Sequence, residues 1–132
     1  MLVDVKREVL TAMFLEYQKD VPNFNNVHRK FNEAGMDKDT FNMAVLKLEN
    51  EGYIHNVHFI KGGHNPHGIL SVRLDNALLT GGTARYMEEQ LELNRTDTPE
   101  EKSKTILRII TDAGLERLEN IAAKIVAEMI KG

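Results

Sequence analysis

The chain contains no cysteine, and this absence removes several classes of chemistry at once. Without thiols there are no disulfide bridges, no zinc–thiolate sites and no thiol nucleophiles. No run of residues approaches the roughly 18 apolar positions that indicate a membrane-spanning helix. The first ten residues, MLVDVKREVL, carry acidic side chains and lack the charged-then-apolar order of an export signal. We therefore expect a cytoplasmic protein without a membrane partner.

An excess of positive charge is also missing. The net charge is −3, whereas domains that bind duplex DNA usually carry a surplus of Lys and Arg. Residues 24–74 hold six Lys or Arg and five Asp or Glu, a margin of one. Any binding to duplex DNA through this region is expected to use about three or four phosphate contacts and to depend weakly on salt.

Catalytic signatures are absent as well. The sequence has no G-x-S-x-G, no H-E-x-x-H and no Gly-rich loop in the strand-to-helix setting that phosphate binding needs. Four of the five histidines fall in residues 55–67, but positions three apart on a strand point to opposite faces. The two that flank a turn are too few for a structural zinc site, which needs four ligands. We expect no enzyme activity, no metal and no cofactor.

The composition indicates a folded protein. Of 132 residues, 42% are hydrophobic and 28% are charged, which predicts one domain with an extension rather than a disordered chain. Apolar spacing predicts helices over residues 3–19, 25–34 and from about 38 to 51. Gly35 and Gly52 end the second and third helices, and Asp37 or Asp39 can cap the third.

Two runs with strand character follow the third helix. Residues 53–61 and 69–74 are separated by GGHNPHG, a series of turn formers, and this predicts an antiparallel hairpin. A fourth helix is expected over about 80–94. A further helix starts behind Thr98, where Pro99 and Glu101 complete a capping box, and the helical pattern continues to Ile130.

The predicted fold is therefore mainly α with a small antiparallel β-hairpin, an α+β class. Three helices followed by a hairpin is the order of a winged helix-turn-helix, here over residues 1–95, plus a long C-terminal helix within residues 96–132. Two segments resemble a known family: TFNMAVLKLENEGYIHNV (Thr40–Val57) and LTGGTARYMEEQ (Leu79–Gln90). In these segments the chain resembles the YjcQ-like family of small winged-helix proteins from Gram-positive bacteria and their phages. The chain departs from that family at Thr83, where the family tends to carry Gly.

The resemblance covers residues 1–95 and implies binding of a nucleic acid or of a partner, with no settled activity. In a DNA-binding winged helix the third helix enters the major groove, where Asn and Lys match base edges. The side of that helix opposite Phe41, Val45 and Leu48 shows Asp39, Asn42, Met43, Leu46, Lys47 and Asn50. Together with the hairpin, the DNA-binding candidates are Lys38, Asn42, Lys47, Asn50, Lys61, His64, His67 and Arg73.

The C-terminal third carries a wide apolar stripe that needs a cover. A continuous helix from Thr98 to Ile130 is about 50 Å long, whereas a domain of 95 residues is about 25–30 Å across. We expect the overhang to form a homodimer, unless the helix folds back near Gly114 and acts as an intramolecular lid. The dimer-interface candidates are Leu107, Ile110, Gly114, Leu118, Ile121, Ile125 and Met129.

Two functions remain open at this point. The first is a dimeric winged-helix regulator that binds double-stranded DNA and derives from a phage. The second is a protein-interaction or assembly module that keeps the winged-helix shape without binding DNA. Exposure of the side formed by Asn42, Met43, Leu46, Lys47 and Asn50 in electropositive surroundings favours the first, and burial of Met43 and Leu46 favours the second.

Overall fold

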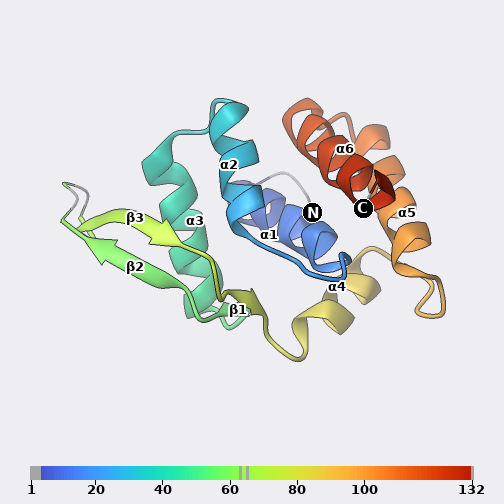
Figure 1. Cartoon of the computed structure of the whole chain (residues 1–132), viewed down its shortest axis with the longest axis horizontal. Helices are drawn as coiled ribbons and strands as arrows, with labels where there is room; N and C mark the ends of the chain where they lie inside the picture. The colour runs from blue at the N-terminus through green and yellow to red at the C-terminus, as the bar shows by residue number, and fades with distance from the viewer. Residues whose placement is uncertain (1–3, 63, 65, 132) are drawn as a thin grey trace.

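The computed structural model describes residues 4–62, 64 and 66–131, and these form six α-helices and four short strands (Figure 1). Three helices come first: α1 (Val5–Tyr17), α2 (Asn25–Glu33) and α3 (Lys38–Asn50). Asp37 caps α3 by accepting the Thr40 N–H at 3.2 Å. Gly35 and Gly52 end α2 and α3 with φ of 91° and 84°, in the left-handed region that glycine adopts without strain. The local signals in the sequence predicted these three helices correctly.

The strands form two antiparallel pairs rather than one hairpin. Strand β1 (Ile54–His55) pairs with β4 (Leu78–Leu79), and β2 (His58–Lys61) pairs with β3 (Ile69–Arg73). The expected single strand over residues 53–61 is interrupted at Asn56, whose φ of 64° turns the chain between β1 and β2. Strand β4 was not predicted, because two residues are too few to show an alternating pattern. The α+β class is confirmed, with β2–β3 as the hairpin.

Helix α4 (Thr83–Gln90) is shorter than the predicted 80–94. Its expected first residue, Thr80, is instead held against the start of β1. The Thr80 hydroxyl donates to the Gly52 carbonyl at 2.7 Å, and the Thr80 N–H donates to the Tyr53 carbonyl at 3.0 Å. At the other end, Glu92 has a φ of 53°, which stops the helix.

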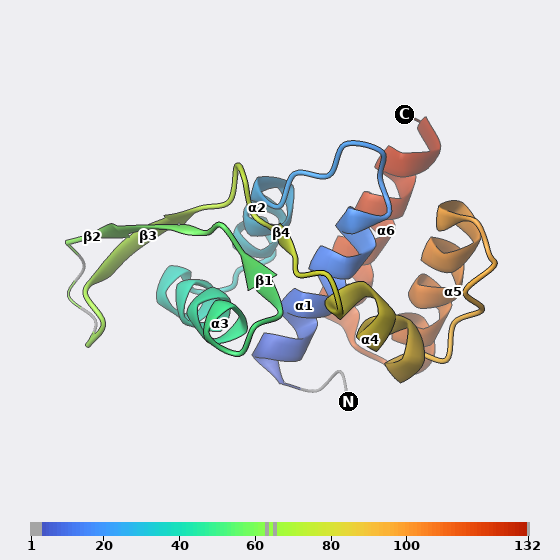
Figure 2. The ribbon, with the colours of Figure 1, turned by 90° about the horizontal axis from the view of Figure 1, so that it is seen from below.

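The prediction of one long C-terminal helix is wrong. Helix α5 (Pro99–Asp112) begins with the expected capping box, in which the Glu101 N–H donates to Thr98 Oγ1 at 3.1 Å. The chain then turns at Gly114, with φ of 72°, into α6 (Glu116–Lys131). The two helices pack side by side (Figures 1 and 2). The 50 Å overhang that motivated a dimer is therefore absent, and of the two alternatives the structure has the fold-back near Gly114.

Helix α1 lies at the centre of the molecule, between α2 and α3 on one side and α6 on the other (Figure 2). Every residue from Glu8 to Glu16 is buried. A single hydrophobic core joins α1 to residues of both the first 95 positions and the C-terminal extension. The extension thus packs as part of the same core.

Ion pairs fix α6 to this core. Arg117 donates two hydrogen bonds to the Glu8 carboxylate, at 2.6 and 3.3 Å. Near the other end of α6, Glu128 accepts from Lys19 at 2.7 Å and from Lys30 at 2.8 Å. Both lysines come from the α1–α2 region, and Lys30 is almost fully buried.

Most of the dimer candidates belong to the core of the chain itself. Ile110, Leu118, Ile121 and Ile125 are buried, because α6 covers α1. In this conformation they are unavailable to a second copy, which corrects their assignment as interface residues. Leu107 and Met129 are half-buried and Gly114 is exposed. A homodimer remains a prediction, and of the seven candidates these three are still accessible to a second copy.

Within residues 4–62, 64 and 66–131, no helix combines the length and apolar character needed to cross a bilayer.

Candidate partner-binding groove

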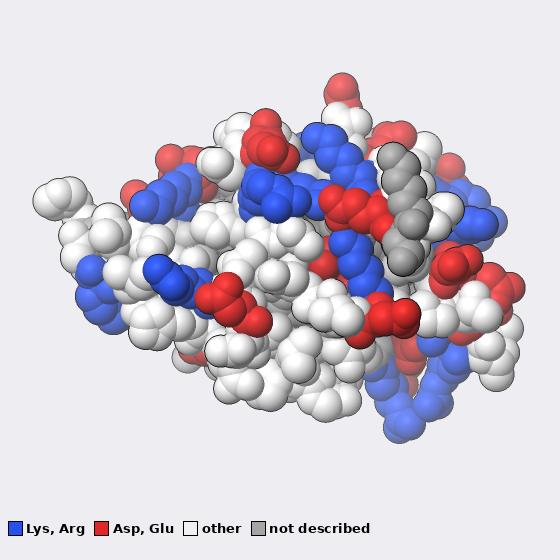
Figure 3. All heavy atoms as spheres, in the orientation of Figure 1, with Lys and Arg blue, Asp and Glu red and all other residues white. Residues whose placement is uncertain are grey.

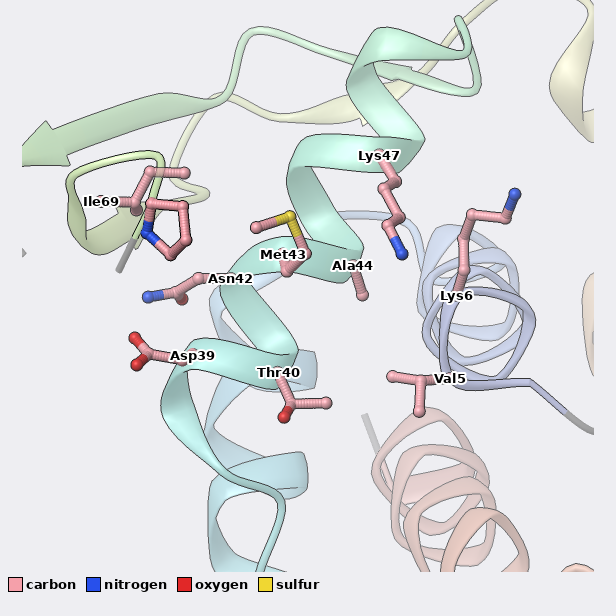
Figure 4. A pocket seen from close by; sticks show the side chains of 10 residues that line it. Val5, Lys6, Asp39, Thr40, Asn42, Met43, Ala44, Lys47 and Ile69 are labelled. Atoms are coloured by element: carbon pink, nitrogen blue, oxygen red, sulfur yellow. The ribbon is translucent and has the colours of Figure 1, made fainter. Parts of the chain in front are cut away.

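The exposed side of α3 forms the floor of an open groove of about 580 Å³. One wall is the start of α1, with Val5 and Lys6, and the other is the end of the hairpin turn, with Pro66 and Ile69. Figure 4 shows Val5, Lys6, Ala44 and Lys47 on one side of α3 and Asp39, Asn42 and Ile69 on the other. The floor residues from α3 are Asp39, Thr40, Asn42, Met43, Ala44 and Lys47.

The helical period explains this arrangement. Phe41, Val45 and Leu48 are buried, as their spacing predicted, and they fix the rotation of α3 on the core. At about 100° per residue, Met43 then lies nearly opposite the buried side. It is half-buried in the centre of the groove, between the two walls. Leu46 is half-buried too, so neither apolar side chain is fully solvated.

Asn42 is the residue that the structure places differently from the prediction. Its side chain is 1% exposed, so in this conformation it cannot read a base edge. Around the axis of α3, the position of Asn42 lies only about 90° from the centre of the buried side, at the boundary between core and surface. On a bare helix such a position is accessible, but here Asn42 is enclosed on the side of the hairpin (Figure 4).

The buried amide of Asn42 has no hydrogen-bond partner among the described residues, at either its oxygen or its nitrogen. A buried polar group that lacks a partner costs about 1–3 kcal/mol, because the hydrogen bonds to water that it had in the unfolded chain are not replaced. Unpaired groups of this kind are uncommon in folded proteins and call for an explanation. The amide offers one acceptor and two donor hydrogens that none of the described residues uses.

Charges are placed at the two ends of the groove. Lys6 is paired with Glu51, at 2.8 and 2.9 Å to the two carboxylate oxygens, and the hydrogen bond to Glu51 raises the pKa of Lys6. Lys47 is exposed and has no ion pair with any described residue. Asp39 is exposed near the first turn of α3. The groove therefore carries an available positive charge at the Lys47 end and a negative charge at the Asp39 end.

The other DNA-binding candidates are exposed, and none of them lines the groove. They are Lys38, Asn50, Lys61, His64, His67 and Arg73. Arg73 lies opposite His58 in the β2–β3 register, so both side chains share the hairpin's outer face. On the side of the molecule in Figure 3, Lys and Arg alternate with Asp and Glu over the helices, and the surface over β1 is largely uncharged. That side shows no continuous basic stripe.

Sequence reasoning missed the groove walls. Val5 and Lys6 precede Asp39 by more than 30 positions, and Pro66 lies in a segment expected only as a flexible tip. The strand pattern of residues 69–74 predicted β3, but it did not indicate which helix the strand faces. No metal site was predicted, and none of the described residues form a cluster of three or more His, Asp or Glu positioned around a common point.

Comparison of the chain with protein-family models, with curated proteins and with solved structures gives no match. Membership of the YjcQ-like family, suggested by residues 40–57 and 79–90, therefore remains a prediction.

Proposed function

We propose that this chain is a protein-interaction module that binds a segment of a partner protein in the groove along α3. One observation carries the proposal: the side of α3 that a DNA-reading helix presents is recessed between α1 and the hairpin and has Met43 at its centre. Apolar side chains from all three elements line this recess. Exposed apolar surface rimmed by polar residues is typical of sites for protein partners.

The same geometry disfavours direct reading of DNA. A recognition helix must protrude into the major groove and bring Arg, Lys, Asn or Gln to base edges. Here Asn42 is withdrawn from the surface, and Lys6 is already neutralised by Glu51. At the groove's edge α3 presents an acidic residue, Asp39, where a DNA-reading helix needs Arg, Lys, Asn or Gln. These features favour the second of the two functions that the sequence left open.

DNA binding by a winged-helix regulator is the second candidate function, because a specific observation favours it. Lys38, Lys47 and Lys61 are exposed on α3 and on β2, the two elements that contact DNA in winged helices. Such binding is expected to be weak and to rest on phosphate contacts.

The two functions separate in one set of binding measurements. A library of random linear 12-residue peptides is selected on the immobilised full chain, and the enriched peptides are measured by fluorescence anisotropy. Met43→Trp fills the groove and is expected to weaken peptide binding more than tenfold. Ala123→Trp, at an exposed position of α6, is the matched control and leaves binding unchanged.

A random duplex is titrated in parallel at low salt, at pH 6 and pH 7.5. Duplex binding that weakens equally for all sequences in Lys47→Ala and Lys61→Ala supports the DNA-binding candidate. Duplex binding together with a failure to enrich any Met43-dependent peptide would overturn the interaction module.

A further inference from the structure

The unused amide of Asn42 and the charges of the groove define what kind of segment fits there. We propose that the groove binds its partner as an extended peptide, with the backbone N–H and C=O of one residue paired to the Asn42 side chain and an acidic residue beside Lys47. This inference rests on the proposed function and specifies the chemistry of its partner.

The Asn42 amide is complementary to the backbone N–H and C=O of one residue in an extended chain. A primary amide presents an acceptor and a donor on one edge, and a residue of an extended chain presents its own N–H and C=O on the same side of the backbone, free to pair. The backbone groups of a helix are already bonded within the helix. Asn42 therefore favours an extended segment over a docked helix, in the manner of peptides that bind through main-chain hydrogen bonds.

Access to the amide requires no hydrogen bond of the protein to break. Both amide atoms of Asn42 are shielded from solvent where they lie, and neither has a hydrogen-bond partner in the part of the chain that the structure describes. The side chain can therefore rotate toward the groove without losing a bond to another residue. The N–H and C=O of a bound residue supply the partners that the described residues do not provide, so binding removes an unfavourable feature of the free protein.

The length and charge of the groove suit a short segment. From Asp39 to Lys47 the floor runs about 12 Å along α3, at 1.5 Å per residue. That span matches about four residues of extended chain at 3.3 Å each. Its centre is apolar, at Met43, and the available positive charge of Lys47 marks one end. A segment with a central aliphatic side chain and a Glu or Asp near one terminus complements both features.

The probe is a panel of acetylated and amidated hexapeptides with a central Leu, and with Glu at one end and Lys at the other in both orders. Peptides with Glu placed at the Lys47 end are expected to bind most tightly, and Lys47→Glu reverses the preferred order. N-methylation of each backbone nitrogen in turn locates the residue whose N–H pairs with Asn42. At that position N-methylation is expected to weaken binding to the wild-type chain about five- to tenfold, the loss of one hydrogen bond.

The same N-methylated peptide is then measured on Asn42→Leu, where its penalty relative to the parent peptide is expected to fall below twofold. Asn50→Leu, on the same helix but outside the groove, is the matched control and keeps the full penalty. In nitrogen-15 NMR spectra of the wild-type chain, the side-chain NH₂ pair of Asn42 is expected to shift when peptide is added. This second readout needs no variant.

Failure of this inference and failure of the proposed function give different results. One result would be peptides that depend on Met43 for binding and yet keep the same affinity after N-methylation and in Asn42→Leu. That result would overturn this inference and leave the proposed function intact. Binding of helix-forming peptides alone would overturn this inference as well. If no peptide binds and random duplex does, the proposed function fails, and this inference with it.

Discussion

Replacing Asn42 by Leu is expected to stabilise the protein, which is the opposite of what most core substitutions do. Leu has the same branching at the γ position, and it removes both unpaired polar atoms from a site that is 1% exposed. Relief of the unpaired groups contributes about 1–3 kcal/mol, and replacing two unpaired groups by apolar ones of similar shape is at worst nearly neutral. The higher helix propensity of Leu adds up to roughly 0.5 kcal/mol.

Urea denaturation followed by circular dichroism measures the effect. The midpoint is expected to rise while the slope with denaturant stays unchanged, since the folded state keeps its compactness. Asn120→Leu is the control, because Asn120 is exposed in the interior of α6 and gains only the propensity contribution. A loss of more than about 1 kcal/mol in Asn42→Leu would refute the reasoning, because it would mean that the amide has a partner or that the larger side chain overpacks the site.

Three further perturbations test the fold. Gly114→Ala is expected to destabilise the chain by about 1–2 kcal/mol in chemical denaturation, because φ of 72° is unfavourable for Ala, whereas Gly82→Ala at φ of −93° has no such cost. Arg117→Leu leaves the buried Glu8 carboxylate without its charged partner and is expected to cost about 1–3 kcal/mol, measured by thermal unfolding. Burial lowers the pKa of His28. Below about pH 6.5 the folded state therefore binds fewer protons than the unfolded state, and the free energy of unfolding decreases as the pH is lowered. That fall between pH 7.5 and 5.5 should shrink in His28→Gln, and an unchanged slope would contradict the assignment.

Features set by a few neighbouring residues were predictable from the sequence. Asp37 as a cap, Gly52 as a helix end and the box formed by Thr98 and Glu101 all occur where the pattern placed them. Each depends on a local backbone conformation or hydrogen bond, which a few neighbouring residues determine. The hydrophobic spacing of α3 also fixed its rotation on the core correctly.

Features set by distant contacts were not predictable. The stripe of α6 required a cover, but nothing in it distinguishes helix α1 of the same chain from a second copy. Pairing of Arg117 with Glu8 decides in favour of α1, and the two residues are 109 positions apart. Asn42 was misplaced for a related reason: its angle on α3 lies at the edge of the buried side, so its exposure depends on a hairpin whose path the sequence leaves open.

The closure of α1 by α6 bears on how the protein is made. Helix α1 leaves the ribosome before its cover, because Leu118, Ile121 and Ile125, which pack on it, are synthesised more than 100 residues later. Because protein synthesis proceeds at about 5–20 residues per second, the apolar side of α1 stays uncovered for at least several seconds before α6 is made. During that interval the nascent chain exposes a hydrophobic surface that a chaperone can bind. Pairing such distant segments also raises the contact order, which slows folding.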